Sequence, residues 1–371
     1  MILQMPNGNC VSGCKPMTAT VRIEADILSR SLGQRLLAAG ASGTAADACV
    51  RALMHASRIG VDSHGVRLVS HYDSVLRAGR VKGNPDISVR RTAAATAVVD
   101  GDDGLGHLAG YRAMEEAIAL AREAGIGAVG VVRSSHFGAA GAYAVAAAQA
   151  GMIGFATTNS DSAVTLFGGA KPFHGTNPLA FAAPSGGRRP WLVDMATSSI
   201  PLNRVLLFRA LGKELPQGVA AGADGTATRD AHAASMLLPL GGEEFGFKGA
   251  ALAGVATVLS AVLQGMTADH AMIPMVGAGD RTTPRNMGHF FLAIDPARFG
   301  GAEVFRAGMA AYLGAVRGAG RDTMAPGDRE WTIEAERERE GIPVDLETAA
   351  FLGLLAGAEG ADTTPQETSR I

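Results

Sequence analysis

The sequence predicts a mixed α/β protein with some α+β character. Between residues 92 and 160, segments with the pattern of strands alternate with segments with the pattern of helices, which favours helices layered on a sheet. From Phe173 to Leu192 the chain is instead rich in glycine, proline and short apolar runs. This composition is typical of a meandering, largely antiparallel sheet with long connections.

Two helices are expected before residue 61. Apolar residues recur at helical spacing over 21–40, and Gly40 ends the pattern. The second helix is expected over 43–60, with Thr44 as its N-cap and Gly60 at its end.

The later elements follow from the same periodicities. The expected strands are 92–100 with a turn to 106, 126–135, 152–160 and 288–295. The expected helices are 108–125, 140–151, 247–266, 328–340 and 344–357, and the last dozen residues are polar.

The composition limits the classes of partner. Apolar residues make up 47% of the 371 residues, charged residues make up 18%, and the formal net charge is −2. No block of like charge indicates nucleic acid or an anionic membrane. No segment reaches about eighteen uninterrupted apolar residues, so no membrane-spanning helix is expected. The first residues lack a signal-peptide pattern, and a cytoplasmic location is therefore expected.

The three cysteines, Cys10, Cys14 and Cys49, are too few for a disulfide framework. No cluster of histidine and cysteine has the spacing of zinc ligands, so no metal site is predicted.

A glycine-rich stretch over Gly101–Gly110 follows a strand pattern and precedes a helix, as in a Rossmann dinucleotide site. Its glycines are spaced G-x-G-x-x-x-G rather than G-x-G-x-x-G, and no acidic residue clearly ends a second strand about twenty residues later. The stretch is therefore interpreted as a tight turn that packs a helix against a strand.

Basic side chains group in the segment Asp62–Tyr72. A third helix is expected to begin with Ser63 as its N-cap and to run to Gly79. His64 would then lie in the first helical turn, where the dipole attracts anions and lowers a histidine pKa. At spacings i, i+3 and i+7, His64, Arg67 and His71 would share one face. We predict Ser63 and Arg67 as substrate contacts for a carboxylate and His64 as a proton carrier; a polar surface stripe is the alternative.

Three further residues have candidate roles. His136 lies between a strand and a small-residue helix, a common place for ligand sites. Asp194 ends an apolar strand and could orient a histidine, bind a ribose hydroxyl or cap a helix. Lys248 opens an apolar helix, where a cation is electrostatically misplaced unless an anion such as a cofactor phosphate also binds there.

These stretches together resemble the malate/L-lactate/L-sulfolactate dehydrogenase family, whose members include ureidoglycolate dehydrogenase and the piperideine- and pyrroline-carboxylate reductases. The resemblance runs from about Ile23 to about Pro343. It is carried by the order of seven short stretches: DSHGVRL, DGDDGLGHLAG, SSHFGAAGAYA, FGGAKPFHGTNPLAFAAP, VDMATSS, FKGAALA and APGDRE.

The resemblance implies a non-Rossmann fold that binds NAD or NADP on a largely antiparallel sheet, and a homodimer with the site near the subunit boundary. It implies acid–base roles for His64 and His136. Implied cofactor contacts are Ser160, Asp194, Met195, Ala196, Lys248, Gly249, Pro326, Gly327 and Asp328.

The expected organisation has four parts: a leader over 1–17, a helical and α/β substrate and dimerisation domain over 18–150 with 295–360, a cofactor-binding sheet domain over 151–294, and a tail over 361–371. Two positions depart from the family pattern. Relatives often have an arginine four residues after the histidine, where Leu68 stands, and Asp328 replaces a glutamate.

The predicted activity is hydride transfer between a nicotinamide cofactor and C2 of a small 2-hydroxy or 2-oxo acid. One alternative is reduction of a cyclic ketimine such as pyrroline- or piperideine-2-carboxylate. A non-catalytic dinucleotide-binding protein is the alternative from another class, because fold does not fix function. The choice between NAD and NADP, and the identity of the small carboxylate substrate, stay open.

Overall fold

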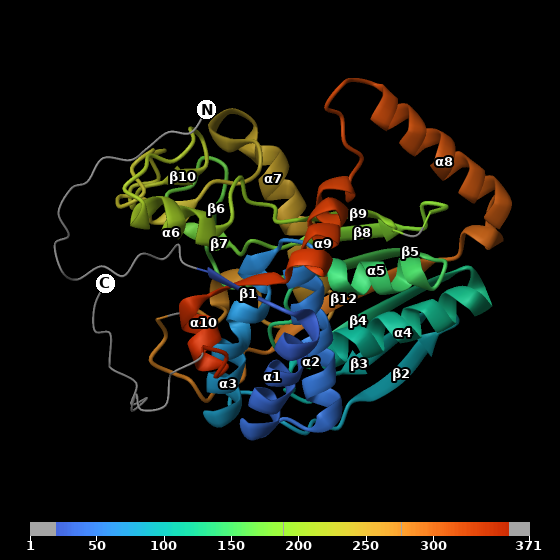
Figure 1. The fold of residues 1–371 in the computed structure, drawn as a ribbon, viewed down its shortest axis with the longest axis horizontal. Helices are drawn as coiled ribbons and strands as arrows, with labels where there is room; N and C mark the ends of the chain where they lie inside the picture. Colours follow the sequence, from blue (N-terminus) through green and yellow to red (C-terminus); the bar gives the residue numbers. More distant parts are fainter. Residues whose placement is uncertain (1–19, 188, 276, 356–371) are drawn as a thin grey trace.

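The computed structural model describes residues 20–355, apart from residues 188 and 276 (Figure 1). The predicted leader, with Cys10 and Cys14, and the predicted tail over 361–371 lie outside the described residues.

A seven-stranded sheet forms the centre of the molecule. Across the described sheet, only β3 and β4 pair in parallel, and the other neighbours are antiparallel, as expected. Its strands, in their order across the sheet, are β2 (Ser88–Ala93), β3 (Thr96–Asp100), β4 (Ile126–Ser134), β12 (Met287–Ile294), β5 (Ile153–Thr158), β8 (Leu179–Ala183) and β9 (Trp191–Met195).

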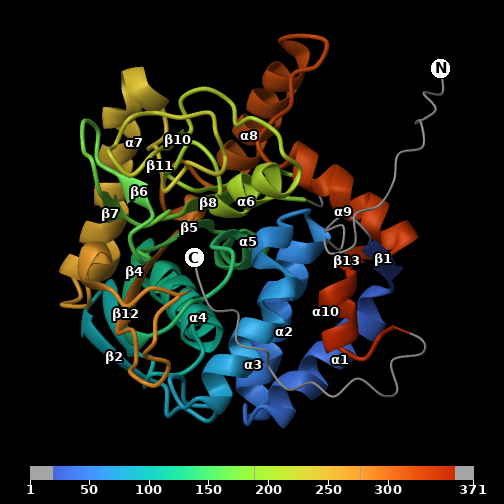
Figure 2. The same ribbon diagram turned by 90° about the vertical axis from the view of Figure 1, so that its left-hand side faces the viewer.

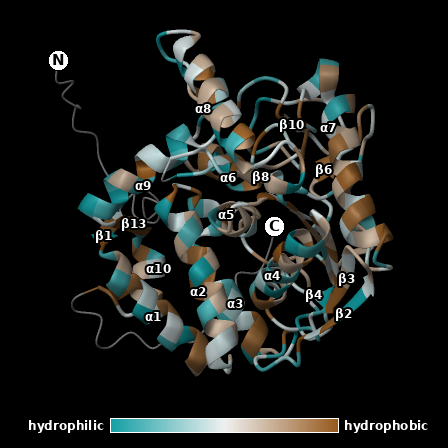
Figure 3. Cartoon of the chain, turned by 90° about the vertical axis from the view of Figure 1, so that its right-hand side faces the viewer, coloured by the Kyte–Doolittle hydropathy of each residue, from teal (hydrophilic) through white to brown (hydrophobic). Residues whose placement is uncertain are grey.

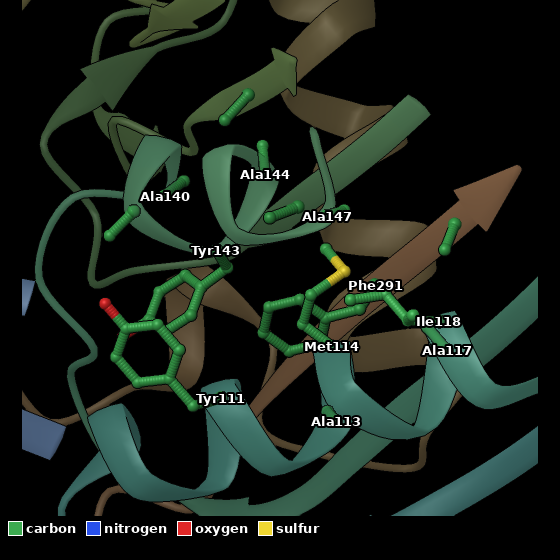
Figure 4. Close-up of a cluster of buried hydrophobic side chains, with 14 of the residues drawn as sticks. Tyr111, Ala113, Met114, Ala117, Ile118, Ala140, Tyr143, Ala144, Ala147 and Phe291 are labelled. Carbon is green, nitrogen blue, oxygen red and sulfur yellow. The ribbon is translucent and has the colours of Figure 1, made fainter. Parts of the chain in front are cut away.

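Two helices, α4 (Gly106–Ala124) and α5 (Gly141–Gln149), cover one face of this sheet (Figure 1). Figure 4 shows the core where they meet, with aromatic and methionine side chains of α4 against Tyr143 of α5 and Phe291 of β12. A Cβ on Gly110 would lie 2.8 Å from the Tyr143 ring, so glycine permits this close helix–helix approach.

The opposite face of the sheet is covered over β12 by the π-helical turn Val258–Val262, which continues α7 (Gly242–Thr257), and α7 itself contacts β5. A Cβ on Gly288 of β12 would lie 1.9 Å from the carbonyl oxygen of Ser260, so the strand and the turn are in backbone contact. By length and composition alone, Gly242–Val262 could cross a membrane, although the sequence predicted no such span. Length and composition alone are weak evidence for a membrane span. About a third (33%) of the apolar stretch is buried, which leaves an apolar face exposed.

The N-terminal helices pack together with residues 342–355 around a second core (Figure 2). The first expected helix is shorter than predicted, because its first residues form a strand that pairs with a strand near the C-terminus. Ser42, rather than Thr44, caps the second helix by accepting a hydrogen bond from Ala45 N at 3.3 Å. The elements are β1 (Thr20–Ile23), α1 (Ala25–Ala38), α2 (Gly43–Arg58), α3 (Val69–Arg77), β13 (Ile342–Asp345) and α10 (Leu346–Phe351).

The remaining elements were mostly not predicted. A small sheet has the order β10–β11–β6–β7. The helix α8 projects from the body of the molecule in Figure 1, and α9 has the predicted bounds. These elements are β6 (Val164–Thr165), β7 (Pro172–His174), α6 (Leu202–Ala210), β10 (Ala220–Ala221), β11 (Met236–Leu237), α8 (Ala302–Gly318) and α9 (Asp328–Glu340).

The central sheet joins strands from both predicted domains, because β2, β3 and β4 lie before residue 150 and the other four lie within 151–294. The predicted domain division stays a prediction, and the mixed α/β architecture is confirmed.

Candidate active site

The Ser-His-Gly segment does not open a continuous α-helix, so that prediction is wrong. Two 3-10 turns, Asp62–His64 and Val66–Leu68, precede α3. Gly65 separates them in an extended conformation, and a Cβ there would lie 2.1 Å from the Ser57 hydroxyl oxygen. That hydroxyl accepts a hydrogen bond from Val66 N at 2.9 Å. The close approach to α2 therefore requires glycine and breaks the helix.

Arg337 of α9 holds the same turn from the other side. Its Nη1 donates to the Ser57 carbonyl and to Asp62 Oδ1, both at 2.5 Å, and its Nη2 donates to Asp62 Oδ2 at 2.9 Å. The turn that carries His64 is thus fixed to two helices.

The structure brings His64 and His136 together. Their rings are stacked with centroids 5.9 Å apart, and the ring of His71 meets that of His136 edge-on at 6.4 Å. Arg67 is exposed, and neither Arg67 nor His64 is among the residues that line the small cavity beside His71 and His136. Because the helix is interrupted at Gly65, the spacing i, i+3 and i+7 does not by itself place His64, Arg67 and His71 on one helical face.

A hydroxyl group holds the Nδ1 atom of each candidate catalytic histidine. The Tyr72 hydroxyl lies 2.6 Å from His136 Nδ1, and the Ser63 hydroxyl lies 3.0 Å from His64 Nδ1. A hydroxyl both donates and accepts, so it can hold either tautomer. When Nδ1–H donates to the hydroxyl, Nε2 is free to accept a proton.

Burial keeps these histidines neutral. Burial lowers the pKa of His64, rather than the helix dipole that the sequence suggested. Burial and the neighbouring histidines, with Arg285, hold the pKa of His136 well below its usual value. Burial, Arg285 and Arg80 lower the pKa of His71 to about 4.

A cavity of about 10 Å³, room for a single water, lies beside His136. Arg80 and Arg285 line it together with His71 and Tyr72. Sequence reasoning missed both arginines and Tyr72. Arg285 is far from Tyr72 and Arg80 in the chain, and only the fold brings it to this cavity. No local sequence pattern therefore identifies the three residues as one group.

Asp194 does not contact a histidine among the described residues. Its Oδ2 accepts a hydrogen bond from Gly141 N at 2.8 Å, at the start of α5. Burial raises the pKa of Asp194 to about 6. These contacts therefore do not support the predicted role of Asp194 in orienting His64. The carboxyl group of Asp194 lies instead at the start of α5, the helix that follows His136.

Most of the predicted cofactor segments are joined by a chain of hydrogen bonds. Thr176 N donates to the Ser160 hydroxyl oxygen at 3.2 Å, and Thr197 N donates to the Thr176 carbonyl at 2.9 Å. Leu240 N donates to the Thr197 carbonyl at 2.8 Å, and Gly249 N donates to the Leu240 carbonyl at 3.1 Å. This chain connects Ser160, the segment Asp194–Met195–Ala196 and the segment Lys248–Gly249.

Lys248 lies in the second turn of α7 rather than at its start, which corrects the prediction. The first turn carries Glu243 and Glu244, which complement the helix dipole. The Lys248 side chain is exposed, with its Nζ 5.1 Å from the centre of the Phe245 ring. An exposed cation of this kind can bind the phosphates of a dinucleotide, and the neighbouring aromatic ring can pack against its rings. Gly249 is required by packing, since a Cβ there would lie 2.3 Å from Leu240 N.

Pro326, Gly327 and Asp328 lie beside β9. The Pro326 carbonyl accepts a hydrogen bond from Leu192 N at 3.3 Å, and Gly327 has φ +96° against the same strand. Asp328 accepts hydrogen bonds from Arg317 at 2.6 and 2.8 Å, so the shortened carboxylate still has a cationic partner.

In the glycine-rich stretch over Gly101–Gly110, residues 101–105 form a tight turn and Gly106 begins α4, so the stretch packs a helix against a strand, as interpreted from the sequence. A Cβ on Gly106 would lie 2.1 Å from the Ser135 carbonyl oxygen, and one on Gly104 would lie 2.5 Å from Pro85. Its glycines thus serve close packing, including the contact that places the loop bearing His136.

Comparisons with known proteins agree with this arrangement. A family model described as malate/L-lactate dehydrogenase matches residues 23–352. The malate dehydrogenase of Pyrococcus abyssi is 36% identical over 304 residues, which are 79% of this chain and 82% of the relative. The L-sulfolactate dehydrogenase of Methanothermobacter thermautotrophicus is 36% identical over 77% of this chain and 82% of its own length. The crystal structure of a malate dehydrogenase from Entamoeba histolytica matches with a TM-score of 0.84 at 28% identity, over 90% of this chain and 97% of that one.

The family model spans nearly all described residues, and both relatives exceed the identity at which a shared family is secure over such lengths. This chain belongs to the malate/L-lactate dehydrogenase family and is an oxidoreductase that uses a nicotinamide cofactor.

Proposed function

We propose that the protein catalyses reversible hydride transfer between NAD(P) and C2 of a small 2-hydroxy or 2-oxo acid. The observation that carries the proposal is the stacked, neutral pair of histidines, His64 and His136, the second of which lines a cavity together with two buried arginines. A proton acceptor next to a guanidinium is the arrangement that oxidation of a hydroxy acid needs.

In the oxidation direction, the proton of the substrate hydroxyl moves to Nε2 of His64, while Ser63 holds Nδ1. The lowered pKa of His64 keeps this nitrogen unprotonated in the free enzyme. A bound carboxylate raises the pKa of a nearby histidine, which favours the protonated form that the reverse reaction needs. His136, held by Tyr72, orients the C2 oxygen from the neighbouring position.

Arg285 is the residue that we assign to the C1 carboxylate. It is buried in the cavity wall and paired with Asp161. Ser63 and Arg67 stay predicted substrate contacts, Arg67 from a more exposed position.

The residues that would hold the dinucleotide are Ser160, Asp194–Ala196, Lys248, Gly249 and Pro326–Asp328. The hydride is the chemistry that this cofactor supplies when bound. The hydrogen-bonded chain from Ser160 to Gly249 supports the assignment, because it fixes these segments relative to one another.

We further propose a cytoplasmic homodimer. Apolar side chains are exposed along α7 and its continuation, with Val258 53% and Val262 63% exposed, and Figure 3 colours much of α7 as hydrophobic. A second subunit that covers this face would remove it from water.

The test is loss of reduced-nicotinamide absorbance with purified protein, NADH or NADPH, and a panel of pyruvate, oxaloacetate, sulfopyruvate and the two cyclic imino acids. Turnover of a 2-oxo acid is the expected result and also identifies the cofactor. Turnover of a cyclic imino acid alone would replace the proposal with ketimine reduction. Cofactor binding without any turnover would favour a non-catalytic binding protein.

A further inference from the structure

Arg80 is a buried guanidinium with incomplete hydrogen bonding. Its side chain is 5% exposed and lines the cavity beside His71 and His136. Within the part of the chain that the structure describes, its Nε has no hydrogen-bond partner. A buried, unsatisfied donor on a charged group is costly, so the position indicates a ligand that completes it.

The charge of Arg80 is also poorly balanced. Its Nη2 donates to the backbone carbonyl of Asp280, whose carboxylate is 4.0 Å away and 42% exposed. Arg285, by contrast, is in direct contact with the carboxylate of Asp161. Of the two arginines that line the cavity, Arg80 is therefore the one whose positive charge is less neutralised by a neighbouring carboxylate.

The electrostatic influence of Arg80 reaches the neighbouring side chains. After burial, Arg285 and Arg80 both contribute to the lowered pKa of His71. After burial and Asp161, Arg80 also affects Arg285, whose pKa it lowers. The recess beside His136 is thus positive before any substrate enters.

The position of Arg80 is fixed by the chain. It follows α3, the helix that carries His71 and Tyr72, after a left-handed turn at Gly79 with φ +78°. Arg80 therefore follows closely in the chain after His71 and Tyr72, and the end of α3 fixes where the short segment that carries the guanidinium begins.

We propose that Arg80 binds a second acidic group of the substrate, so that the enzyme prefers 2-hydroxy and 2-oxo acids with two acidic groups over those with one. This inference rests on the proposed function, in which Arg285 takes the C1 carboxylate. The second carboxylate or sulfonate takes the place of the Asp280 oxygens on Arg80, because the cavity of about 10 Å³ holds no more than a water while that contact persists.

The experiment compares kcat/KM for pyruvate, oxaloacetate and sulfopyruvate in the wild type and in Arg80→Gln. The wild type should prefer the two diacids. Arg80→Gln should lower kcat/KM for the diacids by about 10- to 100-fold, mainly through KM, as expected for loss of a hydrogen bond to a charged group. The value for pyruvate should change by less than about 3-fold, because a single carboxylate does not use this contact.

Arg77→Gln is the matched control, since Arg77 is an exposed arginine at the end of α3, three residues before Arg80, and it pairs with Asp73 outside the site. Its substrate preference should equal that of the wild type. Arg80→Lys is the second variant in case Arg80→Gln does not fold, and it should retain part of the diacid preference because the charge remains.

Three outcomes would overturn the inference while leaving the proposed function intact: a wild type that prefers pyruvate, an equal loss on all three substrates in Arg80→Gln, or an unchanged preference in both Arg80 variants. Absence of turnover by the wild type on every 2-oxo acid would instead contradict the proposed function itself.

Discussion

At the scale of single residues, the proposed chemistry depends on two neutral imidazole rings held by hydroxyl groups. Ser63 holds His64, and Tyr72 holds His136, each through Nδ1. The residues predicted from the sequence thus acquire partners that the sequence did not identify. Each partner can be tested separately from the histidine that it holds.

His64→Ala should reduce turnover by about 10²- to 10⁴-fold, the usual contribution of a general acid or base. The Kd of the cofactor should stay within about 3-fold, because His64 lies outside the segments assigned to the dinucleotide. Stopped-flow turnover and fluorescence titration of the reduced cofactor measure the two quantities. Near-full turnover of this variant would transfer the proton role to His136.

Tyr72→Phe should lower kcat by about 10-fold with little change in KM. The ring of Phe fills the same buried space, but the hydroxyl at 2.6 Å from His136 Nδ1 is lost, and the imidazole is no longer held in one orientation. Steady-state kinetics with a fixed hydroxy acid measure this. A rise in KM without a change in kcat would show that Tyr72 binds substrate instead of positioning His136.

The pH dependence of oxidation follows from the lowered pKa values. The base must be neutral, and burial lowers the pKa of both His64 and His136 from 6.5, so the neutral form persists below pH 6.5. The value of kcat/KM for the hydroxy acid should therefore be level as pH falls from 8 to about 6.5 and should decline only below it. A decline that begins above pH 6.5 would contradict the neutral assignment.

At the scale of elements, a glycine decides the geometry of the Ser-His-Gly turn. A Cβ on Gly65 would lie 2.1 Å from the hydroxyl oxygen of Ser57 and 3.3 Å from its Cα, so the Ser57 side chain would have to turn aside and the turn would have to move away from α2. The helical periodicity of the following residues could not reveal this, because the conflict is with a residue of the preceding helix.

Gly65→Ala should destabilise the protein by about 1–3 kcal/mol, the usual cost of overpacking, and should lower turnover because His64 moves. Thermal or urea unfolding and kinetics measure the two effects. Gly43→Ala is the matched control, since a Cβ at Gly43 meets nothing within 4 Å and should leave both unchanged. An equally stable Gly65→Ala protein would mean that Ser57 can move aside.

At the scale of the whole molecule, the exposed apolar face of α7 and its π-helical continuation predicts an assembly. The wild type should sediment as a dimer. Val258→Asp combined with Val262→Asp should shift it towards a monomer, because two charges would be buried without partners in the interface. Leu37→Asp is the control, since Leu37 is 51% exposed on α1, and this variant should stay dimeric. A monomeric wild type would refute the dimer.

The sequence alone determined the features that depend on neighbouring residues. The bounds of α9, the helix α4, the strand β12 and the tight turn over Gly101–Gly110 follow from local periodicity and glycine spacing. The family resemblance, His64 and His136 also came from short stretches read in order.

Only the tertiary structure decided which distant residues meet. It inserts β12 between β4 and β5, which are closer to each other in the chain, and it pairs β1 with β13. It also brings Arg285, next to β12, to Arg80 after α3, forming the positive recess beside His136. Local periodicity shows which face of a helix or strand is buried. The order of the strands and the positions of the buried charges depend instead on contacts between segments that are far apart in the chain, and no local pattern encodes those contacts.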